Sequence, residues 1–266
     1  SSDARYSARS RRPRPAWCLE PLDCGSRRCR RRLNDAMIEQ IFRQLARPCD
    51  KFEHYFPLYE RHLGEFVGKA PRILEIGVQF GGSAEMWHRF FGAGTQVHGV
   101  DIERQCGDTE YLSLTVGDQG SDAFWRSRFG DCEPCFDIIV DDGSHDNPHQ
   151  IATLVNTYRL LKDGGIYWCE DTHTSYYAGV RVRDGGYGNP RSFIEYAKQV
   201  VDVLHVRHTA HAIGVGPTPD GPHVPAHLVA LYGHVRGVHF YDSVVVIEKG
   251  TPLPFRRLMH GGAHAG

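Results

Sequence analysis

The stretch Phe136-Asp-Ile-Ile-Val-Asp-Asp-Gly-Ser-His145 largely decides how this chain folds and where its chemistry can lie. Its apolar run predicts a strand that is buried on both faces of a parallel sheet. The run ends abruptly in Asp141 and Asp142, which a glycine turn and His145 follow. Because ligands of open α/β sheets bind beyond the carboxyl ends of the strands, we expect these three side chains in one crevice. The alternative is an ordinary Asp-Gly turn with His145 at the start of a helix.

Strand and helix patterns alternate on both sides of that stretch. We expect strands over residues 72–78, 96–102, 111–116, 136–140 and 165–169, helices over residues 51–66, 82–91, 121–129, 147–161 and 192–204, and two final apolar runs over residues 237–241 and 243–247. Such alternation predicts βαβ units and a parallel sheet. Two irregular segments, residues 172–191 and 205–236, are predicted to be substrate loops, because long loops over a strand-end crevice often bind ligands.

The first 33 residues differ in charge from the rest of the chain. They contain ten arginines against three acidic residues, a local charge of +7, whereas the whole chain has a formal net charge of −1 and the remainder therefore −8. A basic arm can contact nucleic acid, an acidic protein or a neighbouring subunit, and an acidic body favours cationic ligands. We divide the chain into a basic appendage, residues 1–50, with a helix that starts at Asn34 and stops at Pro48, and one α/β domain, residues 51–266.

Composition and cysteine usage indicate a globular cytoplasmic protein. The chain is 41% hydrophobic and 24% charged, and its sequence shows neither an apolar run long enough to cross a bilayer nor a secretory signal. The eight cysteines are expected as thiols. Cys132-Glu-Pro-Cys135 has the spacing of zinc ligands but no matching second pair, and His205, His208 and His211 are interpreted as surface or substrate-loop residues.

Acidic residues also follow the earlier strands. Glu75 lies at the end of the first strand, and the glycines after it let the backbone approach a ligand closely, although their spacing is not that of a dinucleotide site. Asp101 ends the second strand, where a carboxylate can accept both hydroxyls of a ribose. Asp118 and Gln119 end the third, where they can read an adenine edge. Three carboxylates at three successive strand ends suit a nucleoside that carries an amino-acid tail.

Together these motifs resemble the S-adenosylmethionine-dependent methyltransferases of actinomycete antibiotic pathways. The similar segments are residues 74–83, 100–102, 117–119, 139–145, 170–171 and 239–249. That group includes macrolide and enediyne sugar O-methyltransferases and the cephalosporin hydroxylase-like proteins, and the resemblance covers about Lys51 to Lys249. It implies an α/β, Rossmann-like methyltransferase fold with a helical N-terminal extension. Within the group, the acidic body and the arginine-rich arm make us suspect the gentamicin-pathway aminoglycoside N-methyltransferase.

The resemblance also implies a role for each residue at the strand ends. S-adenosyl-L-methionine would contact Glu75, Gly77, Gln79, Ser83, Asp101, Asp118, Gln119, Asp141 and Tyr59, and the acceptor would contact Asp142, Glu170, Asp171 and Tyr55. Apart from the resemblance, Tyr176 and Tyr177 are expected to contact the acceptor from the loop 172–191. His145, as general base, and Asp142 would be catalytic. Asp142 and Asp171 correspond to divalent-metal ligands of the sugar O-methyltransferases. This chain lacks the acidic insertion found in their first glycine loop, so Mg²⁺ stays an open question.

We therefore expect an enzyme that methylates an amino group of an aminoglycoside in antibiotic biosynthesis. Carboxylates could hold the ammonium groups of an aminosugar while His145 removes one proton. The alternative is a Mg-dependent sugar O-methyltransferase, in which the metal lowers the pKa of the attacking hydroxyl. An RNA-binding protein and a non-catalytic scaffold are further alternatives, although the acidic body argues against nucleic acid. The expected partners are a small aminosugar, a second copy of the chain in a homodimer, and a protein that the arm contacts.

Overall fold

The computed structural model of this chain describes residues 37–179, 182–205 and 226–251, and residues 253, 258 and 260. The chain divides into two units, Ser1–Asp35 and Ala36–Gly266, and the described residues all belong to the second. This unit begins before residue 51 because helix α1 (Met37–Phe42) packs against the α/β domain and buries Ile38 completely. Residues 37–50 therefore join the domain instead of the appendage.

The described part of the chain contains a single seven-stranded sheet, in the order β3-β2-β1-β4-β5-β7-β6. Its strands are β1 (Arg72–Ile76), β2 (Gln96–Asp101), β3 (Leu112–Val116), β4 (Phe136–Asp141), β5 (Leu161–Cys169), β6 (Val235–Tyr241) and β7 (Val244–Lys249). The first five run parallel, and β7 is antiparallel to both β5 and β6. The predicted parallel α/β sheet is confirmed, and the two final apolar runs form an antiparallel hairpin at one edge.

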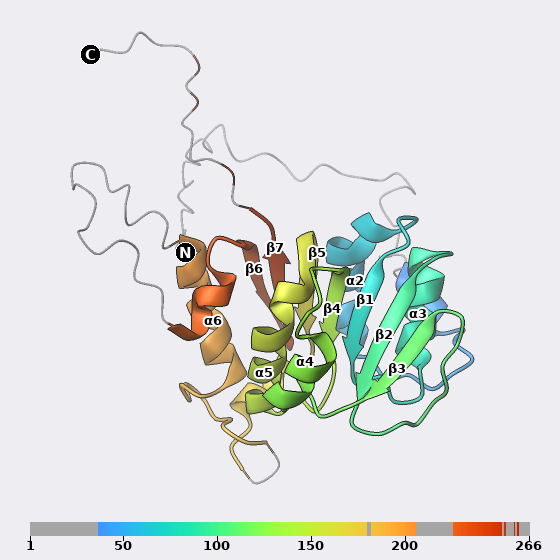
Figure 1. Ribbon diagram of the computed structural model, residues 1–266, viewed down its shortest axis with the longest axis horizontal. Helices are drawn as coiled ribbons and strands as arrows, with labels where there is room; N and C mark the ends of the chain where they lie inside the picture. The colour runs from blue at the N-terminus through green and yellow to red at the C-terminus, as the bar shows by residue number, and fades with distance from the viewer. Residues whose placement is uncertain are drawn as a thin grey trace, which may run out of the picture. The chain divides into compact units, whose positions relative to one another are not determined.

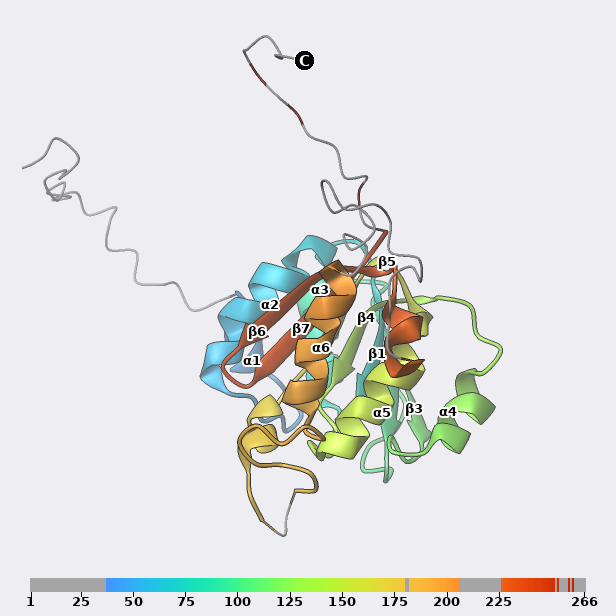
Figure 2. The ribbon, with the colours of Figure 1, turned by 90° about the vertical axis from the view of Figure 1, so that its left-hand side faces the viewer.

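Helices cover both faces of this sheet, as Figures 1 and 2 show. One face carries α4 (Asp122–Phe129), α5 (Asn147–Thr157) and α6 (Phe193–His205), and the other carries α1, α2 (Phe56–Leu63) and α3 (Gly82–Phe91). Short 3₁₀ turns at Glu53–Tyr55, Gly64–Phe66, Tyr158–Leu160, Thr172–Tyr176 and Ala226–Leu231 complete the described elements. Helix α5 is shorter than expected because its pattern continues into the turn at Tyr158–Leu160.

The stretch quoted first lies at the centre of the sheet, between β1 and β5. Alternate side chains of β4 enter the two core layers, so Ile139 packs beneath α5 while Ile138 and Val140 pack on the side of α2 and α3. All three are fully buried. A strand covered on both faces needs a continuous apolar run, which is the pattern that the sequence shows.

Gly77 marks a point where two strand ends almost touch. It has a φ of +86°, and a Cβ atom at this position would lie 1.9 Å from the carbonyl oxygen of Asp142. Only glycine permits both the left-handed backbone and this close approach. The ends of β1 and β4 are thereby held together at the edge where the acidic residues lie.

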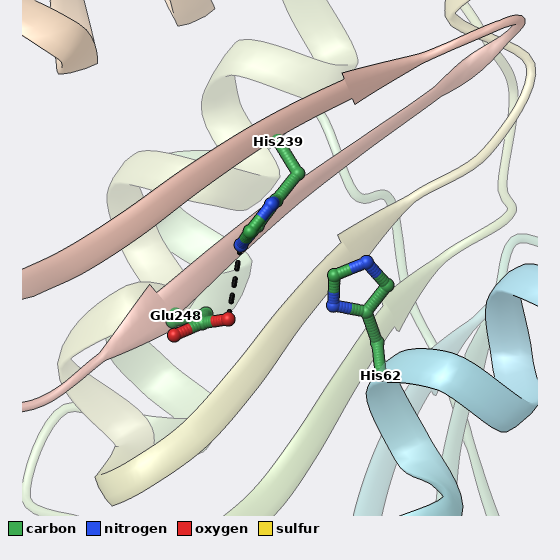
Figure 3. Close-up of side chains that lie close together, drawn as sticks. All are labelled: His62, His239 and Glu248. Carbon is green, nitrogen blue, oxygen red and sulfur yellow. Dashed lines mark hydrogen bonds and ion pairs between the residues drawn. The ribbon is translucent and has the colours of Figure 1, made fainter. Parts of the chain in front are cut away.

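Polar side chains connect the hairpin at the edge of the sheet to α2, and Figure 3 shows three of them, His62, His239 and Glu248. His239 on β6 and Glu248 on β7 are 2.9 Å apart, and Arg236 donates to the second carboxylate oxygen of Glu248 over 3.2 Å. His62 on α2 lies 2.8 Å from the hydroxyl of Tyr241. Ligand atoms of His62, His239 and Glu248 lie within 4.8 Å of one another, but these contacts already account for them structurally. We interpret the cluster as a clasp between hairpin and helix.

The described residues include no helix long and apolar enough to span a membrane. They also include no disulfide, since Cys49, Cys106, Cys132, Cys135 and Cys169 are all free thiols. The expected unpaired state is confirmed for these five. Neither Cys132 nor Cys135 belongs to a group of potential metal ligands among the residues described.

The close approach at Gly77 gives a prediction with an internal control. Gly77→Ala should destabilise the protein by about 1–2 kcal/mol for its positive φ and by a further 1–3 kcal/mol, roughly, for the collision with Asp142. Gly68 also has a positive φ, +75°, but nothing lies within 4 Å of its Cβ position. Gly68→Ala should therefore show only the smaller loss in urea unfolding. Equal losses in the two variants would contradict the close approach.

The clasp gives a prediction about pH. Burial, with positive charge on His239 and Arg61, lowers the pKa of His62 to about 4. An unfolded histidine titrates near pH ~6.5, so above that pH His62 is neutral in both states and does not oppose folding. As the pH falls toward 4, the unfolded chain binds a proton at this histidine that the folded protein does not bind, and the free energy of unfolding falls. The free energy of unfolding should drop by at most ~3 kcal/mol more in the wild type than in His62→Gln between pH 7.5 and 4. Parallel pH profiles for the two proteins would refute this role of His62.

Candidate active site

The register of the parallel strands gathers the acidic residues at one edge of the sheet. Ile76 pairs with Asp141, and Asp141 pairs with Cys169. The next residue on each strand therefore lies at the same carboxyl edge, which brings Gly77, Asp142 and Glu170 side by side. Backbone hydrogen bonds continue the pairing, since the Asp142 amide donates to the Ile76 carbonyl over 3.0 Å.

A pocket of about 200 Å³ opens above this edge and is called here the acidic pocket. Its lining residues are Pro48, Cys49, Asp50, Lys51, Phe52, Tyr55, Gly77, Val78, Gln79, Ser83, Asp142, His145, Glu170 and Asp171. The segment before α2 forms one wall, and the ends of β1, β4 and β5 form the other. The pocket thus brings together the predicted catalytic residues, His145 and Asp142, and four of the six predicted acceptor-binding residues, namely Asp142 again with Tyr55, Glu170 and Asp171.

His145 faces the carboxylates of the acidic pocket. Its Nε2 atom lies 3.5 Å from Asp171 Oδ2 and 4.0 Å from Asp142 Oδ1. Burial lowers the pKa of His145, although Asp171 and Glu170 oppose this effect. The imidazole is therefore neutral at neutral pH and can accept a proton. Gln79, His145 and Asp171 have φ values of +45°, +55° and +54°, a strained backbone that often accompanies functional sites.

Lys51 is a buried cation within the same cluster. Its ammonium donates to Glu170 Oε2 over 2.9 Å and makes a short contact with Asp142 Oδ2. Burial by itself lowers the pKa of Lys51, but the two carboxylates outweigh it and hold that pKa well above its usual value. The pKa of Asp142 is raised by burial and by Glu170, while Lys51 works against both.

Two tyrosines of the segment 53–63 fix the remaining acidic side chains. The hydroxyl of Tyr55 donates to Asp171 Oδ1 over 2.6 Å, and the hydroxyl of Tyr59 donates to Glu170 Oε1 over 2.5 Å. Tyr59 is fully buried and does not line the pocket. The structure therefore places it behind Glu170, where it positions this carboxylate, instead of against the cofactor as expected.

A second pocket of about 260 Å³ adjoins the acidic one and shares Gly77 and Gln79 with it. Asp101, Asp118 and Gln119 line this adjoining pocket, as the sequence predicted for a nucleoside site. Asp101 accepts the Gln79 amide over 2.8 Å, and Asp118 accepts the Gly120 amide over 2.8 Å. The ends of β1, β2 and β3 thus supply a polar surface that continues directly from the acidic pocket.

Glu75 lies beneath the acidic pocket and carries an unpaired oxygen. Trp87 donates to Glu75 Oε1 over 2.8 Å, whereas Glu75 Oε2 is buried without a hydrogen-bond partner in the described structure. Burial raises the pKa of this carboxyl to about 7. His145 Nδ1 is a second buried atom without a partner there. Unsatisfied buried polar atoms are uncommon and often indicate a ligand site.

Some predicted contact residues lie elsewhere. Asp141 is 1% exposed, lines neither pocket, and accepts hydrogen bonds from Gln119 over 3.1 Å and from Tyr167 over 3.3 Å. It therefore orients Gln119 instead of touching a ligand, a position that its one-residue offset from Asp142 explains, because successive strand residues point to opposite faces. Tyr176 and Tyr177 are about half exposed and line neither pocket.

The two predicted substrate loops differ in how much the structure describes. Residues 172–179 and 182–191 of the first loop are described. In this loop, Arg183 Nε donates to the carboxylate of Asp146 over 2.6 Å. Residues 206–225 of the second loop lie outside the described residues, and so do His208 and His211.

Lys51 is a residue of the acidic pocket that the sequence analysis did not single out. It belongs to the segment that we expected to precede the first strand, but nothing in its local pattern indicates a buried ammonium. A lysine next to Asp50 and Phe52 reads as an exposed residue. Only the contacts with Asp142 and Glu170, which directly follow β4 and β5 and lie 91 and 119 residues away, reveal its position.

Asp142, His145 and Asp171 also form a possible metal site. One ligand atom of each lies within 4.8 Å of the others. Carboxylate oxygens are the ligands that Mg²⁺ prefers, and an imidazole can complete such a set for other divalent ions. The donor set therefore fits a divalent cation, including the pair Asp142 and Asp171 that the sequence analysis named.

Comparison with known proteins shows several antibiotic-pathway enzymes. No protein-family profile matches the chain. It is 28% identical over 239 residues to the mycinamicin VI 2''-O-methyltransferase of Micromonospora griseorubida, an alignment that covers 85% of this chain and 54% of that protein. It is 32% identical over 214 residues to the demethylmacrocin O-methyltransferase of Streptomyces fradiae, covering 74% of this chain and 49% of that protein.

A solved structure is similar in fold. It is the MycE methyltransferase from the mycinamycin biosynthetic pathway in complex with Mg and SAH. The TM-score is 0.65 at 26% sequence identity, and the match covers 81% of this chain and 54% of that one. The chain thus spans about half the length of the relatives that it matches.

Proposed function

We propose that this chain, a Rossmann-like S-adenosylmethionine-dependent methyltransferase of the actinomycete antibiotic-sugar O-methyltransferase type, methylates a sugar hydroxyl with His145 as general base. The observation that carries the proposal is the position of His145. A neutral imidazole faces two carboxylates in the acidic pocket, directly beside a second pocket with nucleoside-binding character. The chain spans about half the length of its relatives, so activity and acceptor for the whole protein are part of the proposal.

The adjoining pocket is the proposed place of the adenosyl group. S-adenosylmethionine supplies a methyl group that is already activated by its sulfonium. Asp101 would accept the ribose hydroxyls, and Asp118 with Gln119 would face the adenine. Gly77 and Gln79 border both pockets, which supports a place for the positively charged methionine part at their junction. What this chain contributes is chiefly the alignment of donor and acceptor.

His145 would accept the proton of the acceptor hydroxyl. The proton passes to Nε2 as the oxygen forms its bond to the methyl carbon and the bond from that carbon to sulfur breaks. Asp171 and Asp142, at 3.5 and 4.0 Å, then stabilise the imidazolium. The lowered pKa of His145 keeps the base in its neutral, competent form before the reaction.

A divalent metal suits the same pocket. Asp142 and Asp171 would hold it, and a bound ion would lower the pKa of the attacking hydroxyl. The MycE structure contains Mg with SAH, which supports this assignment for a related protein. The departure that we noted in the first glycine loop does not remove the donor set, because the described pocket has acidic side chains from β4 and β5.

The relatives favour a different acceptor class from the one expected from the sequence. The relatives are named O-methyltransferases of macrolide and polyketide sugars, and none of those compared is an aminoglycoside N-methyltransferase. They favour our alternative over methylation of an aminoglycoside amine, and the gentamicin-pathway suggestion has no support among them. The homodimer, the cytoplasmic location and a protein partner of the arm stay predictions.

His145→Ala should reduce kcat by about 10²–10⁴, the usual contribution of a general base. In the wild type, kcat/KM should fall only at a pH below ~6.5, the usual histidine pKa, because burial lowers the pKa of His145 and protonated His145 cannot act as base. The variant should lose this acidic limb. Liquid chromatography with mass spectrometry would measure the added methyl group, and exposed His234→Ala serves as the matched control. Retention of full activity in His145→Ala would refute the assignment.

Acceptor and donor can be tested in the same preparation. With S-adenosylmethionine, a deoxysugar macrolide should gain methyl mass, and a kanamycin-like aminoglycoside should not. Preferential methylation of the aminoglycoside would restore the N-methyltransferase reading.

Asp101→Ala should weaken SAH binding about tenfold or more in calorimetry, because a charged hydrogen-bond acceptor is lost. Exposed Asp131→Ala should bind SAH like the wild type, and unchanged binding by Asp101→Ala would contradict the proposed ribose site.

A further inference from the structure

The acidic pocket already contains a cation of its own. The side chain of Lys51 is 1% exposed, and its ammonium contacts one oxygen of Asp142 and one of Glu170. Buried lysines are expensive unless paired, and here both partners are carboxylates. Lys51 thus occupies part of the negatively charged space that a bound metal ion would share.

The contacts leave few carboxylate oxygens for a metal. Glu170 Oε1 accepts from Tyr59 and from Trp168, and Glu170 Oε2 accepts from Lys51. Tyr55 takes one oxygen of Asp171. The oxygens that face His145 are Asp142 Oδ1 and Asp171 Oδ2. A divalent ion can therefore recruit Glu170, or the second oxygen of Asp142, only by displacing the ammonium of Lys51.

Electrostatic repulsion between Lys51 and a metal ion also indicates that the two compete for this pocket. Asp142, Glu170 and Asp171 place three acidic side chains in the pocket, and the ammonium of Lys51 contacts two of them. A dication placed among these carboxylates would also be within a few ångströms of the ammonium, at a distance where like charges repel strongly in a poorly solvated site. The ammonium of Lys51 and a metal ion therefore cannot contact the same oxygens of Asp142 and Glu170 at the same time.

We propose that Lys51 is an internal counter-cation that competes with divalent metal for Asp142 and Glu170, and so sets the metal affinity of the pocket. The inference rests on the proposed function, since it assigns this pocket to methyl transfer. Lys51 is in this sense a positioning residue. It holds the carboxylates in place when metal is absent, and it moves away when metal binds.

The test measures metal binding and needs no turnover. Mn²⁺ binding to the full chain can be followed by the loss of the free-ion electron paramagnetic resonance signal. Lys51→Met should bind Mn²⁺ at least about tenfold more tightly than the wild type, a shift within the range seen when groups around metal ligands change. Lys162→Met is the matched control, because Lys162 forms a half-buried pair with Asp137 and lines neither pocket, so its loss should leave the affinity unchanged. Equal or weaker binding by Lys51→Met, or no binding by either protein, would overturn the proposal.

A second measurement uses the unaltered protein, in case Lys51→Met does not fold. Lysine acylation followed by mass spectrometry should find Lys51 protected without metal and modified several-fold faster at saturating Mn²⁺, with Lys162 as internal reference. Labelling of Lys51 that does not respond to Mn²⁺ would overturn the proposal. Methyl transfer is assayed separately, so a protein that binds Mn²⁺ as expected but methylates no sugar would refute the proposed function and leave the competition intact.

Discussion

Burial of several carboxylates at one sheet edge is the constraint on which the site depends. The register of β1, β4 and β5 fixes Asp142 and Glu170 as neighbours, and their charges would repel each other if nothing intervened. Lys51 supplies the missing positive charge, while Tyr55 and Tyr59 donate to the remaining oxygens. The segment before α2 is thereby held against the sheet. Removing one partner of such a buried network costs more than the pair contributes, because the remaining charge is left without solvent.

The backbone at this edge is equally constrained. Gly77 allows the ends of β1 and β4 to approach closely, and Gln79, His145 and Asp171 adopt left-handed conformations that few residues favour. Such strain persists only where the surrounding structure overdetermines it. Here the surroundings are two well-packed layers, with the fully buried Trp87 and Trp168 close to the acidic residues. The packed interior thus holds these pocket residues in backbone conformations that are unfavourable in an isolated chain.

The two adjoining pockets separate two chemical tasks. One offers carboxylates and an amide at the ends of β2 and β3, which suit a nucleoside, and the other concentrates charge and a neutral imidazole. Gly77 and Gln79 border both, so a ligand in one pocket lies next to a ligand in the other. A pocket with an internal ammonium can hold its shape before any cation enters. This arrangement is consistent with the proposed activation of a sugar hydroxyl by His145. Because Lys51 already occupies part of it, an acidic pocket by itself does not identify an amine as the acceptor.

The sequence determined the fold and much of the site, because apolar runs that end in acidic residues specify buried parallel strands and their carboxyl edge. His145, Asp142, Asp101, Asp118 and Gln119, which the sequence analysis singled out, line the two pockets, while their roles there stay predictions. Strand alternation, which only the register made definite, turned Asp141 into a support for Gln119. The tertiary structure alone decided that Tyr59 lies behind Glu170 and that Lys51 is buried between two carboxylates. Local pattern cannot specify such contacts, since they join residues about a hundred positions apart whose spatial proximity depends on how the helices pack against the finished sheet.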